Sequence, residues 1–306
     1  MVRLQVRLFV FFPLLLALLF ILPKTQIAAA VPNEHQDIWR VDLYTAAYFP
    51  ASERYFSHLA YYRWENNHWA ASDAETFFRT QQPEIPLIIF APGYTSTTSR
   101  TTQVGLGIVQ SFDPNKPCRV IFWDWYSDRG PGNIRRDVRS KLPIANNAGV
   151  YLALFLQNLK PQSKVCLFGF SFGSRIVCHA AETLRRNDQR PEGLRLNLVL
   201  SGAATDQNWF ARGQQHSRVP EIVEKILVTY NPDDWVLRFY PLMYNFRDKA
   251  PALGFKGLPM WCIPPEFRAQ FENINVQRNI GKEHQTLFHV RTPAFQSRIN
   301  TYFFFE

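Results

Sequence analysis

The chain has 306 residues, which is long enough for one large domain or two small ones. Its composition, with 46% hydrophobic and 19% charged residues, is that of a globular protein and excludes a disordered chain. The net charge of +9 would fall to +6 without residues 1–30, which contain Arg3, Arg7 and Lys24 and no acidic residue. The remaining cations are scattered and match no nucleic-acid-binding module. The four cysteines form no C-x-x-C pair, which argues against a zinc site.

Residues 1–30 are predicted to be a secretory signal peptide. Arg3 and Arg7 give a positive start, residues 8–22 are an apolar run interrupted only by Pro13, and residues 28–30 are alanines that suit a signal peptidase. The apolar run is shorter than the ~20 residues that a membrane-spanning helix usually needs. We therefore expect a secreted or periplasmic protein, with an uncleaved membrane anchor as the alternative. Residues 31–306 are expected to form one domain.

Predicted strands and helices alternate along residues 31–306. This alternation is typical of an α/β fold with a mostly parallel central sheet and helices on both faces. Short apolar runs predict strands at residues 38–44, 60–70, 85–90, 119–123, 165–168, 196–200, 225–229 and 274–276. Apolar residues at helical spacing and turn signals predict helices at residues 98–112, 144–159, 174–184 and 293–303. A segment rich in proline and aromatic residues, 239–267, is either a small cap over a site or an excursion packed on the core.

The stretch Gly169-Phe170-Ser171-Phe172-Gly173 has the pattern G-x-S-x-G between a predicted strand and a predicted helix. This is the context of a nucleophile elbow, a sharp turn that lifts the serine hydroxyl above the sheet. Flanking glycines let such a turn close without a Cβ clash. The N-terminus of the following helix directs backbone N–H groups toward a developing oxyanion. We therefore interpret Ser171 as a catalytic nucleophile, with a structural serine in a tight turn as the alternative.

A serine nucleophile needs a general base, and the base needs a carboxylate that orients it. His284, before the last predicted helix, is the favoured base, and His289 is the alternative. Asp234 is the favoured acid because it follows the penultimate predicted strand. Asp233 beside it and Asp206, after the preceding strand, are the alternatives. Each aspartate could instead cap a helix, and Asp206 fits that role best.

Together these motifs resemble the α/β-hydrolase superfamily, and residues 38–303 can be laid onto its fold. Within the superfamily the chain is similar to exported bacterial serine hydrolases, esterase-like or lipase-like, whose substrates are unassigned. Two stretches carry this similarity: the elbow with its extension, residues 169–177, and the turn Leu253-Gly254-Phe255-Lys256-Gly257. The resemblance implies Asp234 as the acid, whereas some lipases carry their acid at the place of Asp206.

The resemblance also implies an oxyanion hole made of two backbone N–H groups. One belongs to Phe172, which follows the nucleophile, and the other to Tyr94, in the loop after the strand at residues 85–90. Many relatives have His-Gly where this chain has Pro92-Gly93, but a backbone donor does not require the histidine. Phe170 is expected to flank the nucleophile with apolar surface that would suit an acyl chain.

These features predict an exported serine hydrolase that cleaves carboxylic esters through a catalytic triad of Ser171, His284 and Asp234. No metal or organic cofactor is expected. The expected substrate is a small-molecule or lipid-like ester, no nucleic-acid partner is expected, and the N-terminal segment could associate with a membrane. A peptidase or amidase would use the same triad, and a non-catalytic exported binding protein could keep the same fold.

Overall fold

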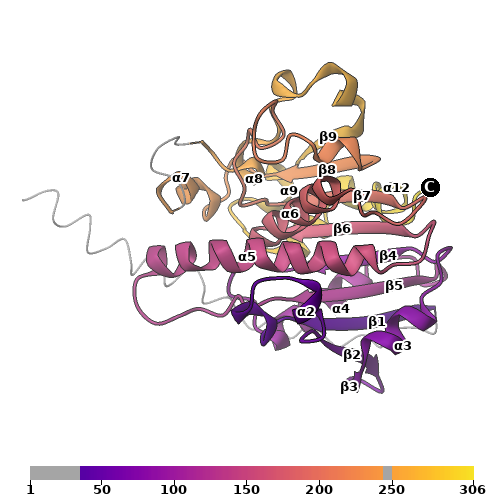
Figure 1. The fold of residues 1–306 in the computed structure, drawn as a ribbon. Helices are drawn as coiled ribbons and strands as arrows, with labels where there is room; N and C mark the ends of the chain where they lie inside the picture. The colour runs from indigo at the N-terminus through magenta and orange to yellow at the C-terminus, as the bar shows by residue number, and fades with distance from the viewer. Residues whose placement is uncertain (1–34, 244–249) are drawn as a thin grey trace, which may run out of the picture.

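The computed structural model describes residues 35–243 and 250–306, and the predicted signal peptide lies outside them. Across the described residues, nine strands form one sheet in the order β3-β2-β1-β5-β4-β6-β7-β8-β9 (Figure 1). Strands β1, β2 and β3 pair antiparallel, and all other neighbours pair parallel. The strands are β1 (Gln36–Asp42), β2 (Ala60–Glu65), β3 (His68–Ser72), β4 (Leu87–Ala91), β5 (Cys118–Asp124), β6 (Lys164–Phe170), β7 (Arg195–Ser201), β8 (Lys225–Tyr230) and β9 (Phe271–Asn275).

Helices cover both faces of the sheet. The longer ones are α3 (Ala74–Thr80), α4 (Thr98–Val109), α5 (Ile134–Gln157) and α6 (Phe172–Asn187); the short ones are α2 (Glu53–Phe56), α7 (Tyr240–Met243), α8 (Leu253–Lys256), α9 (Gln277–Ile280), α10 (Thr286–Val290), α11 (Pro293–Gln296) and α12 (Ile299–Phe303). None of the helices in the described part of the chain is long and apolar enough to cross a lipid bilayer.

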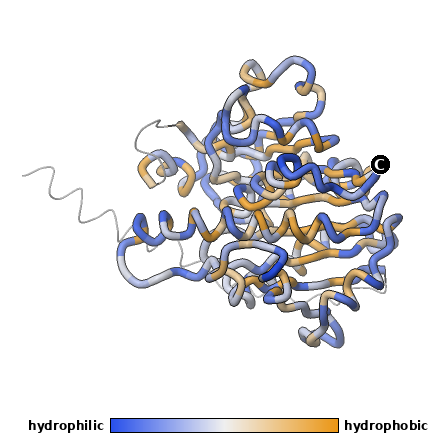
Figure 2. Tube along the Cα trace, viewed as in Figure 1, coloured by the Kyte–Doolittle hydropathy of each residue, from blue (hydrophilic) through white to orange (hydrophobic). Residues whose placement is uncertain are grey.

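Alternate residues of the central strands enter two separate cores. In β4, Leu87 and Ile89 pack with α5 and α6 on one face, whereas Ile88 and Phe90 pack with α4 and α12 on the other. A parallel strand buried on both faces reads as a continuous apolar run, which is how these strands appear in the sequence. Figure 2 shows the hydrophobic residues gathered along the central strands.

The direction of the connections reverses between the neighbouring strands β4 and β6: the chain passes from β4 to β5 on one side and from β6 to β7 on the other. Ligands of open α/β sheets bind at the carboxyl ends of the strands near such a reversal. With the serine turn after β6, next to β4, this is the α/β-hydrolase fold, and the predicted fold class is confirmed.

Three predicted elements differ from the structure. Residues 60–70 form a hairpin of β2 and β3 rather than one strand, because Asn66 and Asn67 adopt positive φ values of 48° and 63° and reverse the chain. The helix predicted at residues 144–159 begins at Ile134 and contains Pro143, a residue that normally marks a helix boundary. The predicted terminal helix is divided into α11 and α12, where Ser297 Oγ donates to the carbonyl of Ala294.

The segment 239–267 packs on the core in its described part. Tyr240, Leu253, Leu258 and Ile263 are buried, whereas Trp261 is exposed. The described residues of this segment therefore follow the core-packed alternative, and residues 244–249 lie outside them.

Candidate active site

Ser171 occupies a strained turn between β6 and α6. Its φ of 52° and ψ of −116° lie in a region that residues with a Cβ rarely adopt. The turn can close because Gly173 has no side chain: a Cβ there would lie 1.9 Å from the carbonyl oxygen of Ala91. Main-chain hydrogen bonds hold the turn from both sides, from Ser171 N–H to the Ser201 carbonyl (3.0 Å) and from Ala204 N–H to the Ser171 carbonyl (3.1 Å).

The structure brings Ser171, His284 and Asp234 together in one hydrogen-bonded series. His284 Nε2 lies 2.9 Å from Ser171 Oγ, and His284 Nδ1 lies 2.6 Å from Asp234 Oδ2. The three side chains come from three different loops, which follow β6, β8 and α9. The Asp234 side chain is fully buried, and that of His284 is 10% exposed. The imidazole is thus shielded from bulk water while it faces the serine hydroxyl.

The two oxygens of the Asp234 carboxylate have different tasks. Oδ1 accepts hydrogen bonds from the N–H groups of Val236 (2.9 Å) and Leu237 (2.8 Å) and so caps the turn that follows β8. Oδ2 faces His284 Nδ1. An acceptor-only carboxylate at Nδ1 places the ring proton there and leaves the Nε2 lone pair toward Ser171. The Asp234 carboxylate therefore caps this turn and faces the imidazole of His284 at the same time.

The carboxylates of the other two candidate aspartates are engaged elsewhere. Asp206 accepts hydrogen bonds from Tyr240 Oη (2.7 Å) and Trp209 Nε1 (3.1 Å). Turns rather than a helix follow Asp206, so the helix-cap interpretation is wrong for this residue. Asp233 accepts a hydrogen bond from Gln277 Nε2 (2.8 Å) at the surface.

His289, the alternative base, is buried beneath the site. Its Nδ1 lies 2.9 Å from Thr229 Oγ1, which in turn lies 2.9 Å from Ser201 Oγ. Burial, and to a smaller extent the nearby His284, lowers the pKa of His289 to about 3. The ring is therefore neutral at physiological pH. The imidazole that faces Ser171 Oγ belongs to His284.

The loop after β4, which carries the predicted oxyanion donor Tyr94, lies beside Ser171. A Cβ on Gly93 would lie 3.1 Å from Ser171 Cβ, so the loop backbone passes directly beside the serine. The loop is fixed by Trp125, whose Nε1 donates to the Pro92 carbonyl (2.9 Å), and by a hydrogen bond from Tyr94 Oη to Asp137. Trp125 and Asp137 carry no signal of this role in the sequence, because the role depends on contacts between distant segments.

Phe172, the other predicted oxyanion donor, is the first residue of α6. Its side chain is fully buried, stacked on Trp125 with 5.9 Å between ring centroids. The segments of both predicted donors, Tyr94 and Phe172, therefore meet at Ser171.

Phe170 does not present open apolar surface beside the serine, so that expectation is wrong. Its side chain is buried, and its ring packs on the imidazole of His284 with 4.9 Å between centroids. The ring of His289 also lies near it, with 5.8 Å between centroids and the planes close to perpendicular. Phe170 therefore packs against the imidazole of His284 instead of forming part of an acyl pocket.

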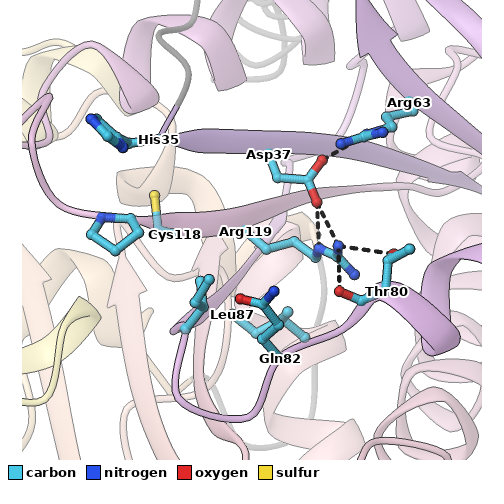
Figure 3. A pocket seen from close by; sticks show the side chains of 10 residues that line it. His35, Asp37, Arg63, Thr80, Gln82, Leu87, Cys118 and Arg119 are labelled. Carbon is cyan, nitrogen blue, oxygen red and sulfur yellow. Dashed lines mark hydrogen bonds and ion pairs between the residues drawn. The ribbon is translucent and has the colours of Figure 1, made fainter.

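A pocket of about 410 Å³ lies at the opposite edge of the sheet, at the amino ends of β1 and β5 (Figure 3). Asp37 bridges Arg63 (2.9 Å) and Arg119 (2.6 Å) there, and Arg119 also donates to the carbonyl of Thr80 (3.1 Å). Both arginines of this pocket are thus paired with the one aspartate, and the pocket lies at the end of the strands away from Ser171. In residues 35–243 and 250–306, no group of three or more histidine, cysteine, aspartate or glutamate side chains is arranged to hold a metal ion.

No protein-family model and no curated protein matches the chain. Solved structures are similar at low identity. An acetyl xylan esterase has 13% identity and a TM-score of 0.33 over 71% of this chain and 95% of that one. The Vlm2 thioesterase domain has 11% identity and a TM-score of 0.32 over 71% and 93%. The RedJ thioesterase of prodiginine biosynthesis from Streptomyces coelicolor has 18% identity and a TM-score of 0.25 over 51% and 60%. At such identities the likeness concerns the fold alone.

Proposed function

We propose that this protein is a serine hydrolase that cleaves carboxylic esters through an acyl-enzyme. The observation that carries the proposal is the series Asp234–His284–Ser171, with contacts of 2.6 and 2.9 Å at the carboxyl ends of the strands. Each residue has the chemistry that its place requires: a hydroxyl on a strained turn, a base within hydrogen-bond reach, and a buried carboxylate that orients the base.

In the first half-reaction, Ser171 Oγ attacks the acyl carbon while its proton passes to His284 Nε2. Asp234 stabilises the resulting imidazolium, which then gives the proton to the departing alkoxide. The alcohol leaves, and the acyl group stays on Ser171 as an ester. In the second half-reaction, His284 removes a proton from water, the hydroxide attacks the acyl carbon, and Ser171 leaves with the proton that His284 returns.

Both half-reactions pass through a tetrahedral intermediate with a negative oxygen. We assign its stabilisation to the N–H groups of Phe172 and Tyr94, since both segments meet at Ser171 and Gly93 allows the loop to approach it. Such donors are effective because they are fixed before the charge develops. The hydrogen bonds of Trp125 and Asp137 supply that fixation.

Esters are the proposed substrate class because the sequence motifs resemble esterase-like and lipase-like hydrolases. The same triad would serve a peptidase or an amidase. Residues 1–30 have the composition of a signal peptide, so we further propose that the reaction takes place outside the cytoplasm.

Labelling with a fluorophosphonate tests the proposal, because an activated serine attacks the phosphorus of this probe, displaces fluoride and becomes phosphonylated. The wild-type protein should be labelled at Ser171, and Ser171→Ala should be neither labelled nor active. The matched control is Ser174→Ala, which removes the next serine of the elbow, whose hydroxyl bonds the Gly169 carbonyl (2.9 Å). This variant should still be labelled. Turnover of nitrophenyl esters but not of peptide anilides supports an esterase, the reverse result an amidase, and absence of labelling a binding protein.

A further inference from the structure

The nucleophile is held by a strap, residues 201–204, that follows β7. Ser171 N–H donates to the Ser201 carbonyl (3.0 Å), and Ala204 N–H donates to the Ser171 carbonyl (3.1 Å). The strap therefore fixes the backbone on both sides of the catalytic hydroxyl. Any element bonded to the strap is coupled to the position of that hydroxyl.

Gly254, in α8, joins the strap to the end of β8. Its N–H donates to the Ala203 carbonyl (2.9 Å), and its carbonyl accepts the N–H of Asn231 (2.8 Å). A Cβ on Gly254 would lie 2.1 Å from the Ala203 nitrogen and 2.2 Å from the Gly202 carbonyl carbon. These are backbone atoms, so a side chain at this position would push the strap away from β8.

Asn231 joins the loop of the acid to the loop of the base. It is fully buried, its carbonyl accepts the N–H of Asp234 (3.0 Å), and its Oδ1 accepts the N–H of Asp233 (3.0 Å). Its Nδ2 donates to the carbonyl of Gly281 (2.7 Å), three positions before His284. One amide side chain thus holds both loops.

We infer that Asn231 and Gly254 are positioning residues that set the distances among Ser171, His284 and Asp234. The bonds form a closed ring, from the nucleophile through the strap, Gly254, Asn231 and the base loop, and the contact between His284 and Ser171 closes it. Neither residue touches the reacting atoms. A change in either one acts by moving the imidazole relative to the hydroxyl. The inference rests on the proposed triad chemistry, in which a misplacement of about 1 Å costs on the order of 100-fold in rate.

Asn231→Ser tests the inference with a small change. The serine hydroxyl can still accept the N–H of Asp233, but it is too short to reach the Gly281 carbonyl. We expect kcat to fall at least about tenfold while KM changes by less than about threefold, because alignment is lost and substrate contacts are kept. The matched control is Asn273→Ser. The amide side chain of Asn273 accepts from Leu258 N–H (2.9 Å) and donates to the Leu258 carbonyl (3.1 Å). It therefore also joins two segments of the chain, but it lies outside the ring of hydrogen bonds that includes Ser171.

Asn273→Ser should lose a similar amount of thermal stability and keep its kcat. Equal loss of kcat in the two variants, or an unchanged kcat in Asn231→Ser, would overturn the inference. Gly254→Ala should lower kcat as well, and since it could fail to fold, the asparagine pair keeps the test decisive.

A second readout does not depend on turnover. The Nδ1 proton of His284, bonded to Asp234, should give a downfield proton resonance that is absent from His284→Ala. Asn231→Ser should shift or broaden this resonance, and Asn273→Ser should leave it in place. If the wild-type protein hydrolyses no ester, the proposed function fails, and the resonance alone decides the inference. An identical resonance in Asn231→Ser and wild type would refute it.

Discussion

Lowering the pH from about 7 to about 4 should destabilise this fold steeply, because three histidines are held neutral in its interior. Burial lowers the pKa of His289 to about 3 and that of His179 to about 4. Burial also lowers the pKa of His216 well below its usual value, with His179 and Arg175 adding to the effect. In the unfolded chain a histidine titrates near 6.5. Below that pH the histidines therefore bind more protons in the unfolded state than in the folded state. Their contribution to the free energy of unfolding is fully present above pH 6.5 and is lost as the pH falls.

The magnitude follows from the slope of proton linkage. Each buried histidine contributes about 1.4 kcal/mol per pH unit between its two pKa values, so three give about 4 kcal/mol per unit near pH 5. Asp124 opposes them, since burial raises the pKa of its carboxyl to about 7 and the folded state then takes up a proton first. The net slope is at most about 3 kcal/mol per unit. Between pH 6.5 and 5 it removes roughly 4 kcal/mol, a large part of an ordinary stability of about 5–15 kcal/mol.

Urea unfolding between pH 7 and 4.5 measures this slope. His216→Leu should make the slope shallower by about 1.4 kcal/mol per unit, and Asp124→Asn should make it steeper by a similar amount. His68→Leu, on the exposed side of β3, is the control for loss of a histidine. A stability that stays flat over this range, or variants that change the slope in the same direction, would refute the reasoning.

Three further outcomes are expected. Asp234→Asn should lower turnover by roughly 10⁴-fold because the amide favours the wrong imidazole tautomer, whereas Asp206→Asn should stay active. Steady-state kinetics of both variants test this, and a larger loss in Asp206→Asn would make Asp206 the acid. Gly173→Ala should abolish labelling by fluorophosphonate and cost about 1–3 kcal/mol of stability, since its Cβ would meet the Ala91 carbonyl; a labelled, stable variant would contradict the described elbow. Mass spectrometry of the protein from its native host should find a mature chain that begins near Val31, and an intact apolar segment in the membrane fraction would exclude cleavage.

The central strands could be predicted from the sequence because both of their faces are buried. Strands β4 to β8 are apolar runs bounded by polar or turn residues, and no partner had to be known to find them. The hairpin of β2 and β3 was missed because two successive asparagines gave no glycine or proline signal at the turn. The first part of α5, residues 134–143, could not be predicted because its arginines and Pro143 conceal the helical period.

The elbow around Ser171 and the histidine before the last predicted helix could also be predicted from the sequence without knowledge of distant contacts. The elbow is a local motif, and its geometry depends on neighbouring residues. The acid could not be identified in this way, because three aspartates follow strands. Only contacts between distant loops distinguish Asp234 from the other two candidates. Asp234 faces His284, whereas Asp206 joins Tyr240 and Trp209 to the chain after β7. Sequence position favoured Asp234, but it does not show which side chain each carboxylate contacts.

The turn Leu253-Gly254-Phe255-Lys256-Gly257 shows how a short motif can accompany a candidate catalytic site without supplying any chemistry. Its second glycine ends α8 with a φ of 74°, a local backbone requirement that glycine meets without strain. The first glycine, Gly254, is required for another reason: the strap bonded to Ser171 passes so close that a Cβ at this position would overlap its backbone. The strap bonds to the N–H of Gly254 and Asn231 bonds to its carbonyl, so Gly254 is in contact with both segments. A larger residue at the second glycine should weaken α8, whereas one at the first should also move the hydroxyl away from its base.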